Sequence, residues 1–188
     1  MGRSGANWSD QANWQGEVKP DGTHGARFAG ATPTAVTVPE AAESAGLTFD
    51  SADGYTLSGD TVNMAFNAGS SIGVSNGTHT IACGIYNPYF MTDVIVETNA
   101  ALTLSGPYTG AGIRKSGAGA LTLTAAANFM ADGITLQEGT LRATPAALNV
   151  GGSTVVSTLA GGTLELTGAG SASPNVNVTG SVTLKSDS

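Results

Sequence analysis

The sequence predicts an all-β fold, a parallel β-helix (β-solenoid) in which short strands stack in successive coils. Three observations predict it: strand-like triplets recur at a loose period of about 20 residues, glycine is frequent, and apolar residues show no sustained helical spacing. The triplets are Leu102-Thr103-Leu104, Leu121-Thr122-Leu123, Leu164-Glu165-Leu166 and Val182-Thr183-Leu184. In each Leu-Thr-Leu run we expect Leu to point into the stack and Thr to point toward water.

Other short alternating runs, many of them rich in β-branched residues, are predicted as strands as well. They span residues 34–38, 45–49, 54–59, 92–97 and 175–178. Turn-forming pairs such as Asn76-Gly77 and Glu138-Gly139 separate the predicted strands. An antiparallel sandwich would be built from similar strands. The large number of very short strands and the variable spacers between them favour stacked parallel coils instead.

The N-terminal segment differs from the rest because its alternation is poor and it carries both tryptophans, Trp8 and Trp14. The open end of a solenoid is an edge of unpaired N–H and C=O groups, which needs covering. We therefore predict a cap over residues 1–33 and solenoid coils over residues 34–188.

Composition and charge exclude several classes of function. Of the 188 residues, 7 are basic and 14 acidic, so the net charge is −7. Nucleic-acid binding needs a basic face, and the densest basic pair is Arg114-Lys115. No run of apolar residues is long enough to insert into a membrane. The lone cysteine, Cys83, lies between apolar residues and is predicted to be a buried, inert thiol.

One stretch carries a specific pattern. Gly117 and Gly119 precede Leu121-Thr122-Leu123, Asn128 and Phe129 follow in a small-polar turn, and a second strand, Gly133–Leu136, leads to Gly139-Thr140-Leu141. This order resembles the autotransporter-associated β-strand repeat of bacterial autotransporter passenger regions. Ala131-Asp132 departs from that pattern, where the family usually has a glycine pair, and the departure affects a turn only.

The N-terminal part is similar to the start of many such proteins, through Trp8, Asn13-Trp14, Phe28, Leu47-Thr48-Phe49 and residues 54–59. The resemblance implies a right-handed, single-stranded β-helix, export across the inner membrane, and a place outside the cell or on the bacterial surface. The chain ends on a strand pattern without a cap, so we expect either a fragment or a unit that abuts another chain.

Enzymatic chemistry has weak candidates in this sequence. β-Helix polysaccharide lyases and hydrolases need carboxylates on adjacent coils. Asp50 and Asp53 flank a turn, where capping and solvation explain them. His24 and His79 lie in turns rich in glycine and threonine, without a partner at metal-ligand or catalytic spacing, and are predicted to be surface residues. We predict no catalytic residue, no metal site and no cofactor.

Aromatic residues are the candidate binding contacts. Tyr86, Tyr89 and Phe90 surround a proline in "IYNPYF", a segment predicted as a loop, and exposed rings stack on sugars or anchor proteins. A bulge padded by these rings is the alternative interpretation. Trp8 and Trp14 are candidates of the same kind, although capping is favoured for both.

The sequence thus predicts a non-enzymatic, extracellular structural and adhesive rod or fibre segment. End-to-end assembly of copies into filaments, and contact with surface glycans or proteins, are the expected kinds of partnership. Two other functions stay open: a carbohydrate-binding module and a β-helix polysaccharide lyase or hydrolase.

Overall fold

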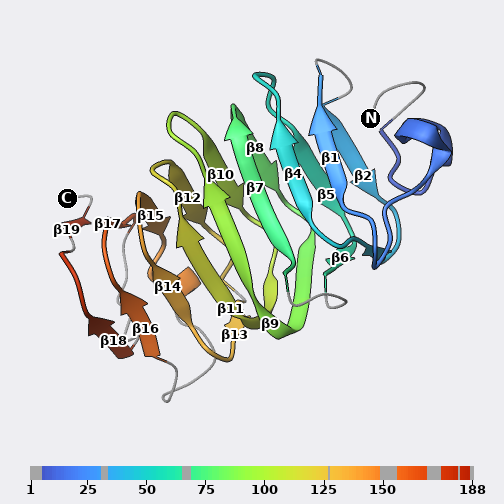
Figure 1. Cartoon of the computed structure of the whole chain (residues 1–188). Coiled ribbons are helices and arrows are strands. Elements are labelled where there is room, and N and C mark those ends of the chain that lie inside the picture. Colours follow the sequence, from blue (N-terminus) through green and yellow to red (C-terminus); the bar gives the residue numbers. More distant parts are fainter. Residues whose placement is uncertain are drawn as a thin grey trace.

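The chain is a parallel β-solenoid whose coils follow one another along a single axis (Figure 1). The computed structural model describes residues 6–30, 34–64, 69–126, 128–148, 156–168, 175–181 and 183–186. Every pairing between described strands is parallel. The predicted fold class is therefore confirmed, whereas the handedness of the winding stays a prediction.

One wall of the solenoid is an eight-stranded sheet of short strands. Its strands, in spatial order, are β2 (Ala35–Val38), β5 (Thr56–Gly59), β8 (Thr78–Ile81), β10 (Ala101–Leu104), β12 (Ala120–Leu123), β15 (Thr140–Ala143), β17 (Thr163–Leu166) and β19 (Thr183–Ser186). Register partners in neighbouring strands are 19 to 24 residues apart in the chain. The period of about 20 residues expected of a coil is thus the length of one turn of chain.

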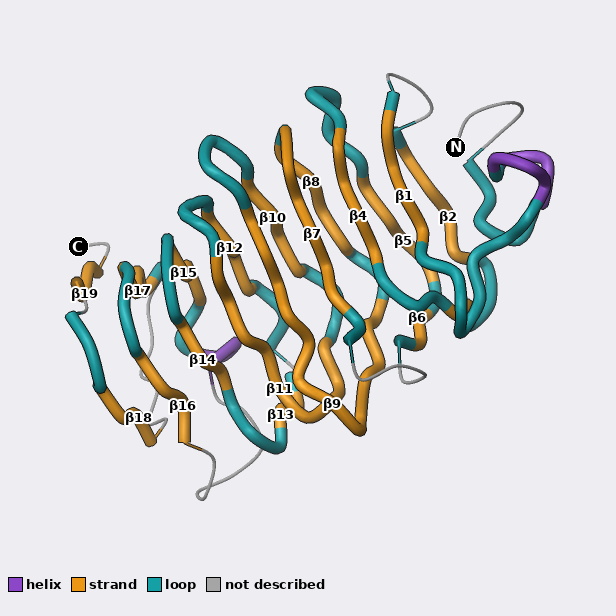
Figure 2. Tube along the Cα trace, in the orientation of Figure 1, coloured by secondary structure: helices purple, strands orange, loops and turns teal. Residues whose placement is uncertain are grey.

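The other walls belong to an eleven-stranded sheet, whose strands alternate along the chain with those of the first sheet (Figure 2). Its main path is β1 (Ala26–Ala29), β4 (Leu47–Asp50), β7 (Ser71–Asn76), β9 (Gly84–Val96), β11 (Tyr108–Ser116), β14 (Ile134–Leu136), β16 (Val156–Leu159) and β18 (Asn175–Val178). Three short strands lie off this path: β3 (Ala42–Glu43), β6 (Thr61–Asn63) and β13 (Phe129–Met130).

Columns of mostly apolar side chains fill the interior, because parallel pairing in register puts equivalent residues above one another. Leu102, Leu121, Leu141 and Leu164 are successive register partners, and all four are buried. The neighbouring column of Thr103, Thr122, Arg142 and Glu165 points outward. The predicted orientation of the Leu-Thr-Leu runs is confirmed.

Aromatic rings form the core at the N-terminal end. The ring of Phe28 stacks on that of Phe49 at a centroid distance of 4.9 Å, and Phe49 stacks on His79 at 4.9 Å. Trp8 and Trp14 each lie 6.0 Å from Phe28. Burying large rings supplies much of the stability of a core, and offset pairs add to it.

The N-terminal segment contains two short 3₁₀-helices, η1 (Gln11–Asn13) and η2 (Gln15–Glu17). A third, η3 (Ala146–Leu148), follows β15. The backbone N–H of Trp8 donates to the carbonyl of Thr37 at 2.8 Å, so this segment lies on the edge of β2. Strand β1 falls inside residues 1–33 and pairs with β4, so the stack begins within the segment predicted as the cap. The capping role itself stays a prediction.

Candidate binding surface

A narrow wall of the solenoid, here called the short face, and the turn at its edge carry the exposed large aromatic side chains of the described residues. The short face consists of β3, β6, β13 and the first residues of β9 and β11. Inward residues of these strands are buried: Ala42, Val62, Ile85 and Tyr108. The residues that alternate with them must therefore point to solvent.

These outward residues stand in one column, here called the short-face ladder. The printed register pairs Glu43 with Asn63, Asn63 with Tyr86, Tyr86 with Thr109, and Thr109 with Phe129. The exposed fractions of Tyr86 and Phe129 are 40% and 52%. Polar and aromatic side chains thus alternate from coil to coil over the last four members of the ladder.

Two further aromatic residues project where β9 turns from the short face onto the next wall. The register of β9 against β11 shifts here: Asn87 pairs with Gly110 and Met91 pairs with Gly112, so residues 88–90 face Ala111 alone. The extra residues bulge outward, which leaves Tyr89 73% exposed and Phe90 37% exposed. Their ring centroids are 6.5 Å apart in an edge-on arrangement.

The segment predicted as a loop is therefore part of a strand, and that expectation is wrong. Tyr86, Tyr89 and Phe90 all lie within β9. Pro88 lacks an N–H and is normally excluded from a central strand, but a bulge leaves its residues unpaired and so tolerates it. Pairing with β11 is interrupted only around Pro88, and the strand continues on either side.

Buried polar contacts hold the backbone behind the bulge. The side-chain amide of Asn87 donates to the hydroxyl of Thr92 at 2.9 Å, and that hydroxyl lies 2.9 Å from the hydroxyl of Tyr108. The Tyr108 hydroxyl donates to the carbonyl of Gly112 at 2.8 Å. Burial raises the pKa of Tyr108, so its hydroxyl keeps its proton and its role as donor.

The close approach of neighbouring coils at the bulge also explains why residue 110 is a glycine. A Cβ built at Gly110 would collide with the carbonyl oxygen of Asn87 in the preceding coil and come within 2.9 Å of the Tyr108 hydroxyl. Glycine is the residue that permits such contact between backbones. The hydrogen-bond network and the close contact at Gly110 together fix the backbone from which Tyr89 and Phe90 project.

Both tryptophan candidates lie in the core. Trp8 is 0% exposed and Trp14 is 7% exposed, and their rings contact each other edge-on at 5.0 Å. The indole N–H of Trp14 donates to the carbonyl of Trp8 at 2.9 Å. Protein atoms therefore cover the ring faces that would have to stack on a ligand.

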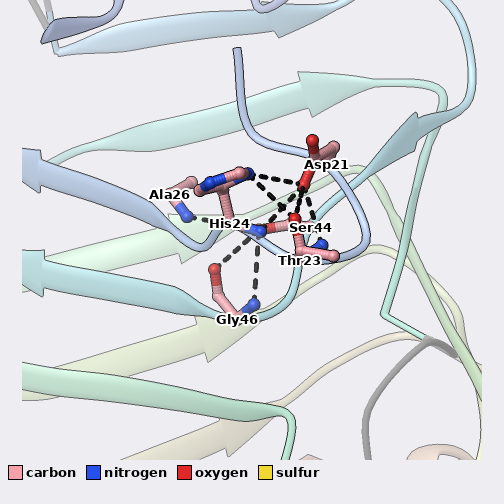
Figure 3. A network of polar contacts seen from close by, with 6 residues as sticks. All are labelled: Asp21, Thr23, His24, Ala26, Ser44 and Gly46. Carbon is pink, nitrogen blue, oxygen red and sulfur yellow. Dashed lines mark hydrogen bonds and ion pairs between the residues drawn. The ribbon is translucent and has the colours of Figure 1, made fainter. Parts of the chain in front are cut away.

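The two histidines occupy opposite environments. His24 is exposed, as predicted, in a tight turn where Asp21 accepts hydrogen bonds from the N–H groups of Thr23 and His24 (Figure 3). The backbone N–H and hydroxyl of Thr23, followed by His24, hold the pKa of Asp21 well below its ordinary value. Asp21 therefore stays ionised as the anchor of this turn.

His79, in contrast, is fully buried, so the surface prediction for it is wrong. It stands in the inward column as the register partner of Leu102. Its Nδ1 accepts from the N–H of Tyr55 at 3.0 Å, and its Nε2 lies 2.7 Å from the carbonyl of Asn76. The imidazole can fill a core position because both nitrogens find backbone partners.

Lys115 is a buried polar residue that the sequence argument missed. The side chain is fully buried, and its Nζ donates to the carbonyls of Ser116, Gly117 and Glu138 at 2.7, 2.6 and 3.2 Å. The sequence signal for its burial is its position, because it directly follows the outward-pointing Arg114 in a strand whose side chains alternate. Arg114 is the outward member and pairs with Asp93 at 2.8 Å.

The acidic candidates Asp50 and Asp53 lie at the surface. Asp50 receives a 2.6 Å hydrogen bond from Arg27, whose guanidinium is the main reason that the pKa of Asp50 is lowered. Asp53 is exposed in the turn before β5. Within the described ranges, no group of three His, Cys, Asp or Glu side chains is placed to hold a metal ion.

Comparison of the chain with protein-family models, curated proteins and solved structures gives no match. None of the described helices is long and apolar enough to cross a membrane. The geometry above is therefore the basis for the functional proposal.

Proposed function

We propose that this chain is a non-enzymatic structural and adhesive segment, a rod that holds exposed side chains at fixed places along its length. The observation that supports the proposal is the parallel pairing of strands from coil to coil throughout both sheets. Each strand is hydrogen-bonded to the coil before it, so side chains on a wall repeat at a fixed interval of about 4.8 Å. A rigid, evenly spaced surface of this kind suits contact with an extended partner.

The use of the chemically capable side chains supports a role without catalysis. His79 has both ring nitrogens in contact with backbone groups, and Lys115 donates to three carbonyls. Burial raises the pKa of the Cys83 thiol to about 12, which keeps it protonated and unreactive. These groups stabilise coils and turns.

The proposed setting is outside the cell or on the bacterial surface, as the resemblance to the autotransporter-associated repeat implies. End-to-end contact between copies is part of the proposal. Leu184 continues the inward column after Leu164 and is 72% exposed, so a further coil stacked on β19 would bury it. A head-to-tail contact of this kind does not close on itself and leads to filaments.

Negative-stain electron microscopy of the purified chain at several concentrations tests assembly. Filaments that lengthen with concentration are expected, and Leu184→Asp should shorten them because it places a charge in the contact. Discrete particles at every concentration would contradict end-to-end assembly but would not contradict the proposal that the single chain acts as a rod.

A panel of polysaccharide substrates tests the absence of catalysis. We expect no release of reducing or unsaturated ends from any of them, polyuronates included. Turnover that is lost in Asp50→Asn or Asp53→Asn would overturn the proposal in favour of a lyase or hydrolase.

A further inference from the structure

We infer that the short-face ladder is a binding site for a neutral, extended β-1,4-linked glycan, with Tyr86 and Phe129 as its two stacking platforms. This goes beyond the structural role, because it assigns a ligand class to particular residues. It rests on three features of the face: the spacing of the rings, the polar residues between them, and the local charge.

The spacing is set by the fold. Tyr86 and Phe129 are both register partners of Thr109, one on each side, so their backbones lie two coils apart. Neighbouring strands are about 4.8 Å apart, which puts the two residues about 10 Å apart along the solenoid axis. That interval is close to the length of one disaccharide in an extended β-1,4-linked chain.

The geometry of such a glycan explains why two rings at this interval would be used. Successive sugars in the chain are turned over relative to each other, so the same face recurs only at every second sugar. An equatorially substituted pyranose presents an apolar C–H face to which an aromatic ring packs. Two rings two coils apart would meet equivalent faces of alternate sugars, and a continuous stripe of rings is not required.

Polar groups occupy the positions between and beside the rings. The exposed Thr109 lies between Tyr86 and Phe129, where its hydroxyl can donate to and accept from the hydroxyls of the intervening sugar. Asn63 and Glu43 continue the column on the far side of Tyr86. A few hydrogen-bonding groups among apolar contacts are the usual composition of a sugar-binding surface.

Charge decides between classes of polysaccharide. The short-face ladder contains no lysine or arginine, its one ionisable carboxylate is Glu43, and the whole chain has a net charge of −7. A polyuronate or sulfated chain would be repelled by this surface. A neutral glucan or chitin-type chain would not.

Isothermal titration calorimetry of the whole chain with cellohexaose and chitohexaose tests the inference. At least one of the two should bind, while maltohexaose, with α-1,4 linkages, and oligogalacturonate should bind more weakly. Tyr86→Ala and Phe129→Ala should each weaken binding about tenfold. Ile95→Ala is the matched control, since Ile95 is an outward, 38% exposed apolar residue of the same strand on another wall, and it should bind like the unchanged chain.

A relocated platform tests the spacing separately from the number of rings. The double variant Phe129→Ala with Thr109→Tyr keeps two rings but places them one coil apart, and it should bind no better than Phe129→Ala alone. Full affinity in the double variant would contradict the spacing argument. Circular dichroism melting of each variant confirms that the exposed substitutions leave the fold intact.

Three results would overturn the glycan assignment. These are the absence of binding to both β-1,4-linked probes, affinity unchanged by either alanine variant, and a concentration-dependent dimer abolished by Tyr86→Ala in a chain that binds neither probe. The last result would reassign the rings to contact between copies. None of these results bears on the rod itself, whose filaments are tested independently through Leu184.

Discussion

Lys115 in β11 and Leu136 in β14 are register partners in one inward column, so an ammonium group and a leucine side chain occupy equivalent places in successive coils. Val94, on the other side of Lys115, continues the same column and is fully buried. The alkyl stem of the lysine can pack where a leucine would. The charged end reaches the carbonyls of its own turn and of Glu138 in the following coil.

Replacing Lys115 by methionine should destabilise the protein although the methionine is the more apolar residue. The stem volume is kept, but the carbonyls of Ser116, Gly117 and Glu138 lose a common donor. Leaving buried acceptors unsatisfied costs about 1–3 kcal/mol of unfolding free energy. Chemical denaturation at neutral pH measures the loss, and a variant as stable as the unchanged chain would show that water replaces the ammonium group.

Lys115 should also contribute to the pH dependence of the unfolding free energy. Burial lowers the pKa of Lys115 from 10.5 to about 8, opposed by the charges of Glu138 and Glu97. Between these two values the unfolded chain holds a proton that the folded chain has released, so Lys115 makes the unfolding free energy rise with pH. Cys83 acts in the opposite direction, because burial raises its pKa to about 12 and the unfolded chain loses that proton from about pH 8.5 upward. The comparison is made below pH 10.0, because the raised pKa values of Tyr55 and Tyr108 lower stability above it. The unfolding free energy of the unchanged chain minus that of Lys115→Met should therefore rise with pH from about 8, because Cys83 contributes equally to both chains.

Neighbouring residues of β15 should respond in opposite ways to truncation. Leu141 points inward and is 1% exposed, so Leu141→Ala leaves a cavity and should cost about 2–5 kcal/mol. Arg142 points outward and pairs with Glu165 at 2.9 Å across the coils, a surface ion pair whose loss should cost less than about 1 kcal/mol. Urea midpoints of the two variants make the comparison. Similar losses would mean that the wall does not alternate as described.

Gly110 should be intolerant of alanine, in contrast to a glycine on an open wall. The added Cβ would collide with the Asn87 carbonyl of the preceding coil, so coils must separate locally, at a cost of about 1–3 kcal/mol or more. Gly73 in β7 has no atom within 4 Å of a built Cβ and serves as the control, with an expected change from none to a small gain. The melting temperatures of Gly110→Ala and Gly73→Ala, each compared with that of the unchanged chain, test this prediction.

Cys83 should be inert in the folded protein and reactive only on unfolding. Its thiol is 1% exposed, and burial raises its pKa to about 12, whereas an unfolded cysteine titrates at about 8.5. At about pH 8 an aromatic disulfide reagent should react slowly with native protein and at once in guanidinium. Rapid reaction without denaturant would contradict the burial of this residue.

Much of the fold could be predicted from the sequence because its repeating unit is short. Leu121-Thr122-Leu123 shows within three residues which side chains enter the core, and neighbouring coils repeat the pattern. The burial of His79 is not specified by such a pattern, and that of Lys115 is indicated only by its position after the outward Arg114. Each side chain is polar by type, and its burial is favourable because backbone groups of its own turn and of an adjacent coil are its hydrogen-bond partners.

The short face was only partly predictable for a related reason. Tyr86, Tyr89 and Phe90 stand together in the sequence, so their shared exposure could be foreseen. Phe129 joins Tyr86 only through the register across Thr109, and a shift of one residue would turn it inward. The distance from Tyr86 to Phe129 along the chain is two coil lengths, which no local pattern specifies.

The coil-by-coil hydrogen bonding has a mechanical consequence. Each coil is tied to the next by the two sheets, and no strand of the eight-stranded sheet reaches past its neighbour. A pull on the two ends of the chain would load these bonds one coil at a time, and each freed coil of about 20 residues would release up to about 70 Å of chain. A protein built this way would lengthen under force in discrete steps while its remaining coils stay folded.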